Sequence, residues 1–493
     1  MNIKNAKKQI ASTIRAYLAK DSEGRYLIPP HKQRPVFLVG APGIGKTEIM
    51  SQIASEMGIG LISYSMTHHT RQSAIGLPII KHRRYGDEEF DITEYTMSEI
   101  ISSVYELMES SGVKNGILFL DEINCISETL MPIMLGFLQY KVFGGHKLPE
   151  GWVVVTAGNP PEYNSSVREF DIVTYDRLKL IEVSPELDAW KEYAYACGVH
   201  SAVITYLEIK PQNFYKIESS SGVRRFVTAR GWDDLGRALG AYEQLGIAAD
   251  KELIGQYIRI DAIAEDFAVY YELYNKYRSD YKVQAVLSGD AGEDIKQRAK
   301  NAAFDERYSL LGLILEALRE RTARVLEQEE LISGLKEVLA GIKQQKDADI
   351  SAMLRAAQAD CRERRERLKA SGGLSEYKDR LLSRQADALS ELSAVADGGF
   401  EAVSAAYSGR VEQFKAQVSE VRDAHSNMFS FCEEVFGAAQ ELLILVTELA
   451  ASPVNARFIA HYGCDDYYRY DKQLMFGERR QGIVSEIEGL LAE

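Results

Sequence analysis

The sequence predicts an α/β core with a five-stranded parallel sheet, followed by an all-α segment and a long C-terminal helical region. Short apolar runs alternate with helical patterns from Pro35 to about Val183, which is typical of parallel strands joined by crossover helices. Helical patterns without strands then continue to Lys276. From Ser279 to Leu449 the chain has no proline and is rich in Glu, Arg, Gln, Ala and Leu, which favours long helices. The five apolar runs are Val36–Val39, Leu61–Tyr64, Ile117–Leu120, Val153–Thr156 and Leu180–Val183.

The composition is that of a globular protein: 46% of the 493 residues are hydrophobic and 26% are charged. We find no run of eighteen apolar residues and no apolar N-terminal signal, so we expect a cytoplasmic protein without membrane contact. The net charge of −14 argues against nucleic acid as the main ligand. Five scattered cysteines form no C-x-x-C pair, and the adjacent His68 and His69 lack a third ligand nearby. These residues therefore predict neither a disulfide framework nor a metal site.

A glycine-rich motif follows the first apolar run. Gly40 to Thr47 reads GAPGIGKT, and a helical pattern begins at Glu48. Glycines let backbone N–H groups surround a polyphosphate, and the helix N-terminus adds partial positive charge. Lys46 is expected to reach the β- and γ-phosphates of ATP, and the Thr47 hydroxyl to bind Mg²⁺. The expected nucleotide-binding residues are Gly40, Ala41, Pro42, Gly43, Ile44, Gly45, Lys46, Thr47 and Glu48.

Polar residues end the third and fourth apolar runs, where open α/β sheets bind ligands. Asp121 and Glu122 follow Ile117–Leu120, and Asn159 follows the run that contains Val153–Thr156. Asp121 is expected to hold Mg²⁺, and Glu122 to polarise the water that attacks the γ-phosphate. Asn159 is expected to orient that water or to contact the γ-phosphate.

The segments GAPGIGKT, LFLDEIN, TAGNPPEYN and YDRLKLIEV, in this order and spacing, resemble the MoxR-type AAA+ ATPases. The resemblance covers roughly Pro30 to Lys276 and implies a ring, expected to be a hexamer. It implies that Asp121 and Glu122 are the Walker B acids and that Asn159 is sensor 1. It further implies that Arg177 is the finger reaching the neighbouring subunit's nucleotide, and that Arg230 is sensor 2 on a helical lid.

Without the resemblance, the residues themselves give weaker support for the roles of Arg177 and Arg230. A guanidinium suits the charge spread over transferring phosphoryl oxygens, but Arg168 is a rival for the finger, and Arg224 and Arg225 are rivals for sensor 2. Cys125 departs from the basic residue that family members often carry after the DEIN segment. Coupling between subunits could then differ, and nothing supplies the base partner that a nucleophilic thiol would need.

Two insertions interrupt the core. A polar stretch from His68 to Glu88 matches the helix-2 insert of this AAA+ clade by its position. The segment Tyr140–Leu148 reads as a hairpin with a Gly144-Gly145 turn and matches the pre-sensor-1 hairpin. The resemblance implies that both face the pore of the ring and touch substrate.

The C-terminal third carries long apolar stripes. Residues from Val411 to Leu449 fit one a/d heptad frame that includes His425, which predicts a coiled coil. An earlier stripe from Leu311 to Ile342 slips register after Val325, Gly372-Gly373 and Gly398-Gly399 are expected breaks, and Pro453 is expected to close the helical region. The aromatic-rich segment from Arg457 to Tyr470 is expected to pack back on the protein. The predicted segments are an N-terminal helix and linker (1–34), the AAA+ core (35–184), the lid (185–278), the coiled-coil domain (279–452) and the aromatic-rich end (453–493).

Three functions remain open from sequence. The first is an ATP-hydrolysing ring that remodels a protein partner in a chaperone-like role; the family resemblance implies a partner that commonly contains a von Willebrand factor A domain. The second is a nucleic-acid motor or restriction-type NTPase, which the net acidity disfavours. The third is a coiled-coil scaffold gated by nucleotide, which the intact Lys46, Asp121 and Glu122 disfavour.

Overall fold

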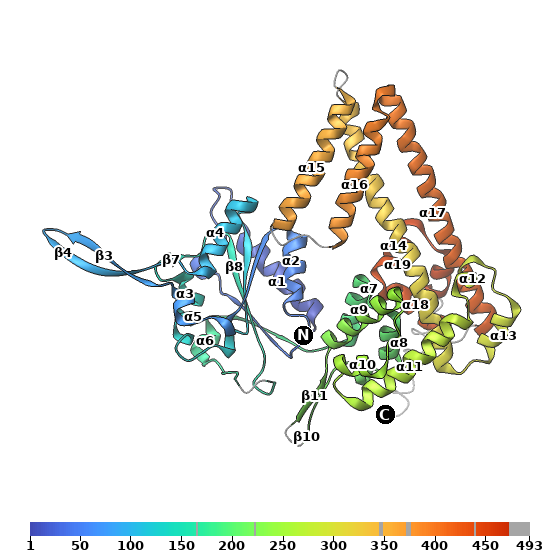
Figure 1. The fold of residues 1–493 in the computed structure, drawn as a ribbon, viewed down its shortest axis with the longest axis horizontal. Helices are drawn as coiled ribbons and strands as arrows, with labels where there is room; N and C mark the ends of the chain where they lie inside the picture. The colour runs from blue at the N-terminus through green and yellow to red at the C-terminus, as the bar shows by residue number, and fades with distance from the viewer. Residues whose placement is uncertain (164–165, 221–222, 345–348, 371–375, 438–439, 473–493) are drawn as a thin grey trace, which may run out of the picture. The chain divides into compact units, whose positions relative to one another are not determined.

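The computed structural model describes residues 1–163, 166–220, 223–344, 349–370, 376–437 and 440–472 (Figure 1). The chain divides into two compact units. The first comprises Met1–Ala189 and Ala359–Ser383, and the second comprises Trp190–Gln358 and Arg384–Glu493. The five segments predicted from the sequence remain a prediction.

The first unit contains the predicted five-stranded parallel sheet, in the order β2-β5-β8-β1-β9. All four pairings are parallel, with Val36 of β1 opposite Val155 of β8 on one side and Lys179 of β9 on the other. Residues of β5 and β8 are buried almost without exception, which explains the continuous apolar runs. The strands are β1 (Val36–Gly40), β2 (Gly60–Ser65), β5 (Gly116–Asp121), β8 (Trp152–Gly158) and β9 (Lys179–Val183).

Helices pack their apolar stripes in this unit. In α1, Ala6, Ile10 and Ile14 are fully buried, and Asn2 caps the helix by accepting a hydrogen bond from the Asn5 backbone N–H at 2.9 Å. The predicted N-terminal amphipathic helix is thereby confirmed. The helices are α1 (Ile3–Leu18), α2 (Glu48–Met57), α3 (Arg71–Ile75), α4 (Glu99–Ser111), α5 (Met131–Tyr140) and α6 (Ile172–Asp176).

Both insertions contain antiparallel ribbons. The polar stretch leads into β3 (Pro78–Tyr85) and β4 (Glu88–Tyr95), which extend away from the sheet (Figure 1). Every residue of β3 is exposed. The predicted hairpin at Tyr140–Leu148 is confirmed as β6 (Val142–Phe143) and β7 (His146–Lys147), and Gly144 and Gly145 take the positive φ values of 52° and 93° that its turn requires.

The second unit is mainly helical, with one exception. The strands β10 (Lys216–Ser220) and β11 (Val223–Val227) pair as an antiparallel ribbon, so the prediction that strands stop after the core is wrong at this point. The alternating, short run from Val223 to Val227 gave too weak a periodic signal beside the longer helical patterns. The helices of this part of the chain are α7 (Leu187–Cys197), α8 (Ser201–Ile209), α9 (Ala229–Leu245), α10 (Lys251–Tyr257), α11 (Asp261–Asp280), α12 (Val283–Ser288) and α13 (Glu293–Asn301).

Long helices follow, as predicted: α14 (Phe304–Lys343), α15 (Ile350–Ala370), α16 (Glu376–Ala394) and α17 (Gly399–Phe436). Two shorter helices, α18 (Gln440–Ala451) and α19 (Pro453–Tyr462), come after them. The Gly398-Gly399 break is confirmed, whereas Gly372-Gly373 lies outside the described residues. The heptad frame predicted from Val411 to Leu449 does not continue through one helix, because α17 ends at Phe436 and its C-cap Gly437 has a φ of 72°. Pro453 does not close the helical region; it ends α18 and begins α19, where its missing N–H costs no hydrogen bond.

The aromatic end packs back as predicted. Phe458 is fully buried in a core with Val325, Leu326 and Val421, and its ring stacks on His425 with centroids 5.2 Å apart. Across the described residues, no single helix is long and apolar enough to cross a membrane; the bent pair of α18 and α19 meets that criterion by length and composition.

Candidate nucleotide-binding site

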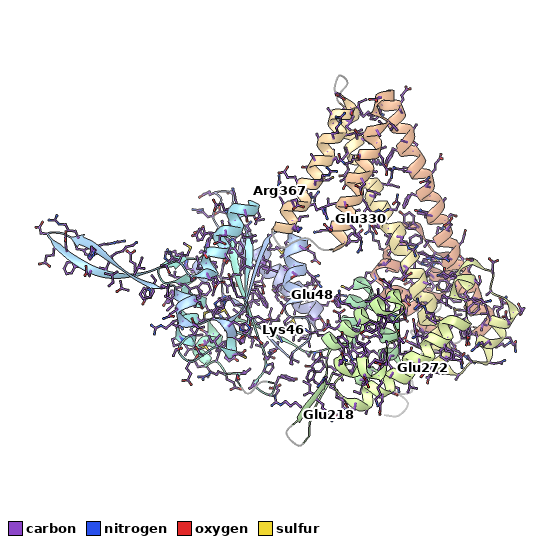
Figure 2. The ribbon with its side chains drawn as sticks, viewed as in Figure 1. Lys46, Glu48, Glu218, Glu272, Glu330 and Arg367 are labelled. Atoms are coloured by element: carbon purple, nitrogen blue, oxygen red, sulfur yellow. The ribbon has the colours of Figure 1, made fainter. Side chains whose placement is uncertain are left out.

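The glycine-rich loop joins β1 to α2 in the strand-loop-helix order that its sequence predicts. Gly43 and Gly45 have φ values of 72° and 92°, which residues other than glycine rarely adopt. Ile49, Met50 and Ile53 bury one face of α2 and fix the direction of its N-terminus. Figure 2 shows Lys46 and Glu48 at this end of α2.

The Lys46 ammonium is buried and its hydrogen bonds come from the surrounding loop. It donates to the carbonyl oxygens of Gly40 at 2.7 Å and Ala41 at 2.8 Å, and to Asn159 Oδ1 at 2.8 Å. These acceptors satisfy a charge that would otherwise be costly to bury. Phosphate oxygens are stronger acceptors than carbonyls, so the same ammonium can exchange these partners for a nucleotide's phosphates.

Two oxygen ligands face each other across the sheet edge. The Thr47 hydroxyl donates a hydrogen bond to Asp121 Oδ2 at 2.9 Å. Hydroxyl and carboxylate oxygens suit Mg²⁺, which takes few protein ligands and completes its shell with waters and phosphates. Within the described ranges no group of three or more His, Cys, Asp or Glu residues could hold a metal ion by itself. These two residues fit a magnesium ion that is bound together with the nucleotide.

Glu122 lies at the end of β5 with an unusual backbone. Its φ of 55° places it in the left-handed region, which costs a non-glycine residue of order 1–3 kcal/mol. Its Oε2 accepts hydrogen bonds from Ser65 Oγ at 3.0 Å and from Thr67 Oγ1 at 3.2 Å. The carboxylate is therefore held by hydroxyls at the end of β2 and just beyond it, beside Asp121.

Asn159 is fixed from two sides. Its Oδ1 accepts from Lys46, and its backbone carbonyl accepts from Asn124 Nδ2 at 2.8 Å. At Gly158 a Cβ atom would come within 2.5 Å of Asn124 Oδ1, so this approach requires glycine. Asn124 thus connects the segment after β5 to the end of β8.

The structure brings Lys46, Thr47, Asp121, Glu122 and Asn159 to one edge of the sheet, as the sequence predicts. Sequence reasoning did not single out Ser65, Thr67 or Asn124. The signal was present for Ser65 and Thr67, because they follow an apolar run and so belong to the carboxyl edge by the same rule that selected Asp121.

The candidate arginines are all exposed. Arg177 is exposed and follows α6, while Arg168 pairs with Glu128 at 2.6 Å. Arg230 is exposed on α9 in the second unit. Of the rivals for sensor 2, Arg225 pairs with Asp261 at 2.5 Å and Arg224 is exposed on β11. The roles of these arginines remain predictions.

Cys125 is half-buried in the turn after Glu122. Burial, followed by the charges of Glu122 and Asp121, raises the pKa of its thiol. A raised pKa disfavours the thiolate, so this cysteine is poorly suited to nucleophilic chemistry.

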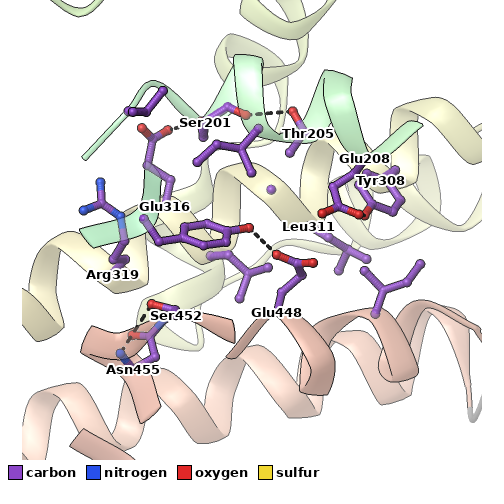
Figure 3. Close-up of a pocket in the computed structure, with 16 residues that line it drawn as sticks. Ser201, Thr205, Glu208, Tyr308, Leu311, Glu316, Arg319, Glu448, Ser452 and Asn455 are labelled. Carbon is purple, nitrogen blue, oxygen red and sulfur yellow. Dashed lines mark hydrogen bonds between the residues drawn. The ribbon is translucent and has the colours of Figure 1, made fainter. Parts of the chain in front are cut away.

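A second polar cluster lies inside the second unit and was not predicted. Lys191 donates to Glu448 at 2.9 Å and also pairs with Glu208, and the Tyr195 hydroxyl donates to Glu448. Figure 3 labels Glu208 and Glu448 in the adjoining pocket. Burial is the main cause that raises the pKa of Tyr195 well above its usual value, and the negative charge of Glu448 raises it further. The adjoining cavity of about 30 Å³ has room for one or two water molecules and none for a nucleotide.

The fold and the site together define a P-loop nucleotide-binding α/β domain. Residues 36–171 match the family described as "ATPase family associated with various cellular activities (AAA)", which identifies this segment as an AAA ATPase family domain.

Two further comparisons add less. A crystal structure described as "a putative ATPase from Cytophaga hutchinsonii" aligns at 13% identity and a TM-score of 0.23, over 37% of this chain and 46% of that one. This chain thus spans less than half of that protein, and a similarity this low carries no argument. A search of curated proteins found no match.

Proposed function

We propose that this protein is an ATP-hydrolysing AAA+ ring of the MoxR type that remodels a protein partner. The observation that carries the hydrolytic part is the meeting of Lys46, Thr47, Asp121 and Asn159 in one hydrogen-bonded edge, with Glu122 beside it. This edge offers a cation for phosphates, two oxygens for Mg²⁺, and a carboxylate to polarise water. Bound Mg²⁺ would neutralise charge on the β- and γ-phosphates.

In this proposal Glu122 must leave the hydroxyls of Ser65 and Thr67 before it acts as a base. Its present hydrogen bonds stabilise the carboxylate and occupy one of its oxygens. With the Glu122 carboxylate held in this way, the protein would hydrolyse little ATP until a bound partner or a neighbouring subunit rearranges the end of β2.

The ring and the partner rest on weaker support. The exposed Arg177 is available to a neighbouring subunit, and hydrolysis completed in trans would couple activity to assembly. The long helices α14 to α17 offer an arm for partner contact, and the resemblance to MoxR-type proteins favours a partner with a von Willebrand factor A domain.

The decisive experiment measures steady-state ATP turnover of the wild type and of Glu122→Gln under assembling conditions, with binding of a fluorescent ATP analogue as a control. We expect turnover to fall by about 10²-fold or more in the variant while the analogue still binds. Equal turnover would favour the nucleotide-gated scaffold.

A second experiment separates the nucleic-acid motor from protein remodelling. A salt-titrated DNA-binding assay is expected to give weak binding, because the chain carries a net charge of −14. Tight binding with a steep salt dependence would overturn the remodelling proposal in favour of the motor.

A further inference from the structure

An open groove of about 1180 Å³ lies on the second unit, between α11 and the loop that joins α9 to α10. The candidate nucleotide-binding loop, Gly40 to Glu48, belongs to the first unit. Its apolar lining comes from Ile247, Val269 and four alanines, Ala248, Ala249, Ala262 and Ala268.

The large apolar side chains here are unusually exposed. Ile247 is 50% exposed and Val269 is 61% exposed. Leu273 lies one helical turn beyond Val269 on α11 and is 42% exposed, and Leu245 at the end of α9 is 72% exposed. Single exposed apolar residues need no explanation, but Ile247 and Val269 line the same groove, and an exposed apolar surface of this kind marks a site for a partner.

The charges around the groove are mainly negative. Five carboxylates line it, on Glu243, Asp250, Glu265, Asp266 and Glu272, against two cations, on Lys251 and Arg278.

Three of these carboxylates already have cationic partners: Glu243 pairs with Arg278 at 2.5 Å, Asp266 with Lys210 at 2.6 Å, and Glu265 with Lys251. Among the residues that the structure describes, Asp250 and Glu272 take part in no ion pair. Figure 2 labels Glu272 on α11.

We propose that this groove binds a basic amphipathic helix of a protein partner. The apolar face of such a helix would cover Ile247 and Val269, and its lysines or arginines would pair with Asp250 and Glu272. Val269 in the groove and the exposed Leu273 one turn further along α11 would contact apolar side chains spaced one turn apart on the partner helix. The acidic rim would repel nucleic acid and anionic lipid, so a protein segment fits this chemistry best.

The proposal does not depend on ATP hydrolysis, and it is tested by binding in the absence of nucleotide. The probe is a fluorescein-labelled synthetic helix of about four turns with leucines on one face and lysines on the other. A matched peptide carries glutamates in place of the lysines. Fluorescence anisotropy measures the affinity of each peptide for the full chain and for the groove variant, which combines Val269→Asp with Glu272→Lys.

The matched control is a double variant that combines Leu443→Asp with Glu412→Lys. It makes the same kinds of change at exposed positions of α18 and α17 outside the groove. We expect the lysine peptide to bind wild type and control equally and the groove variant at least about tenfold more weakly. Binding of the wild type to the glutamate peptide should be weaker than to the lysine peptide, and added salt should narrow the difference.

Equal affinity of the lysine peptide for the wild type and the groove variant would overturn the proposal, as would equal binding of the two peptides. Sedimentation of the same proteins checks a second copy of this chain as the occupant. Loss of self-association in the groove variant, with no loss of peptide affinity, would assign the groove to that copy instead.

Discussion

The Lys46 ammonium and the Asn159 amide oxygen lie 2.8 Å apart, which joins the glycine-rich loop to the end of β8. Because Lys46 also bonds to the carbonyls of Gly40 and Ala41, it is fully satisfied before any phosphate arrives. In the proposed function, nucleotide binding would exchange one set of hydrogen bonds for another and would release Asn159 to act on the γ-phosphate or on water.

Asn159→Ala is expected to keep ATP binding within a few-fold and to reduce turnover by about 10²-fold, the usual cost of losing one polar group that stabilises a transition state. Binding of a fluorescent ATP analogue and steady-state phosphate release measure the two effects. Asn213→Ala, in the second unit, is the control. A variant with wild-type turnover would remove Asn159 from the catalytic set.

The double variant that combines Ser65→Ala with Thr67→Val should raise the basal ATP turnover, because it frees the Glu122 carboxylate from two hydrogen bonds. Each bond contributes about 1 kcal/mol, and together about 2 kcal/mol, so a rise of up to about 30-fold is expected. Ser103→Ala, which removes a hydroxyl bonded to Tyr64 and not to Glu122, should leave the rate unchanged. A decrease in the double variant would mean that the hydroxyls position Glu122 for catalysis.

Arg177→Ala should bind ATP normally and lose about 10³-fold in turnover if its guanidinium completes a neighbouring site. Arg168→Ala is the matched comparison, since Arg168 pairs with Glu128 at 2.6 Å and should be dispensable. Adding an ATPase-inactive Lys46→Ala subunit that carries Arg177 should restore part of the activity. The opposite ranking of the two arginine variants would assign the finger to Arg168.

His425 makes stability depend on pH. Burial lowers its pKa from the usual 6.5 to about 4, so the folded protein keeps the ring neutral while the unfolded chain binds a proton below pH 6.5. The stabilising effect is present above pH 6.5 and is lost as the pH falls toward 4. We expect a loss of about 2 kcal/mol between pH 7 and pH 5.

Denaturant unfolding at several pH values measures this effect. His425→Leu should flatten the profile between pH 6.5 and pH 4 relative to the wild type, and His31→Gln, at an exposed position, should not. An unchanged slope in His425→Leu would assign the acid sensitivity to other groups.

The local signals of the chain predicted most of the fold. The glycine-rich loop, the apolar runs and the proline-free stretch each determine structure over a few residues, so strands, helices and the Gly144-Gly145 turn follow from local chemistry. Two errors came where a single residue changes direction: Gly437 caps the end of α17 within a continuous heptad frame, and Pro453 starts a helix rather than closing the region. The third error, the missed ribbon of β10 and β11, came from a short run with a weak periodic signal.

By itself the sequence determined that Lys46, Thr47, Asp121, Glu122 and Asn159 belong to one edge of a parallel sheet, because carboxyl ends of parallel strands share an edge. Only the tertiary structure decided which of these groups touch, that Ser65 and Thr67 hold Glu122, and that Asn124 fixes Asn159. These contacts join strands far apart in sequence, and hydrogen bonds depend on tenths of an ångström that no local pattern encodes.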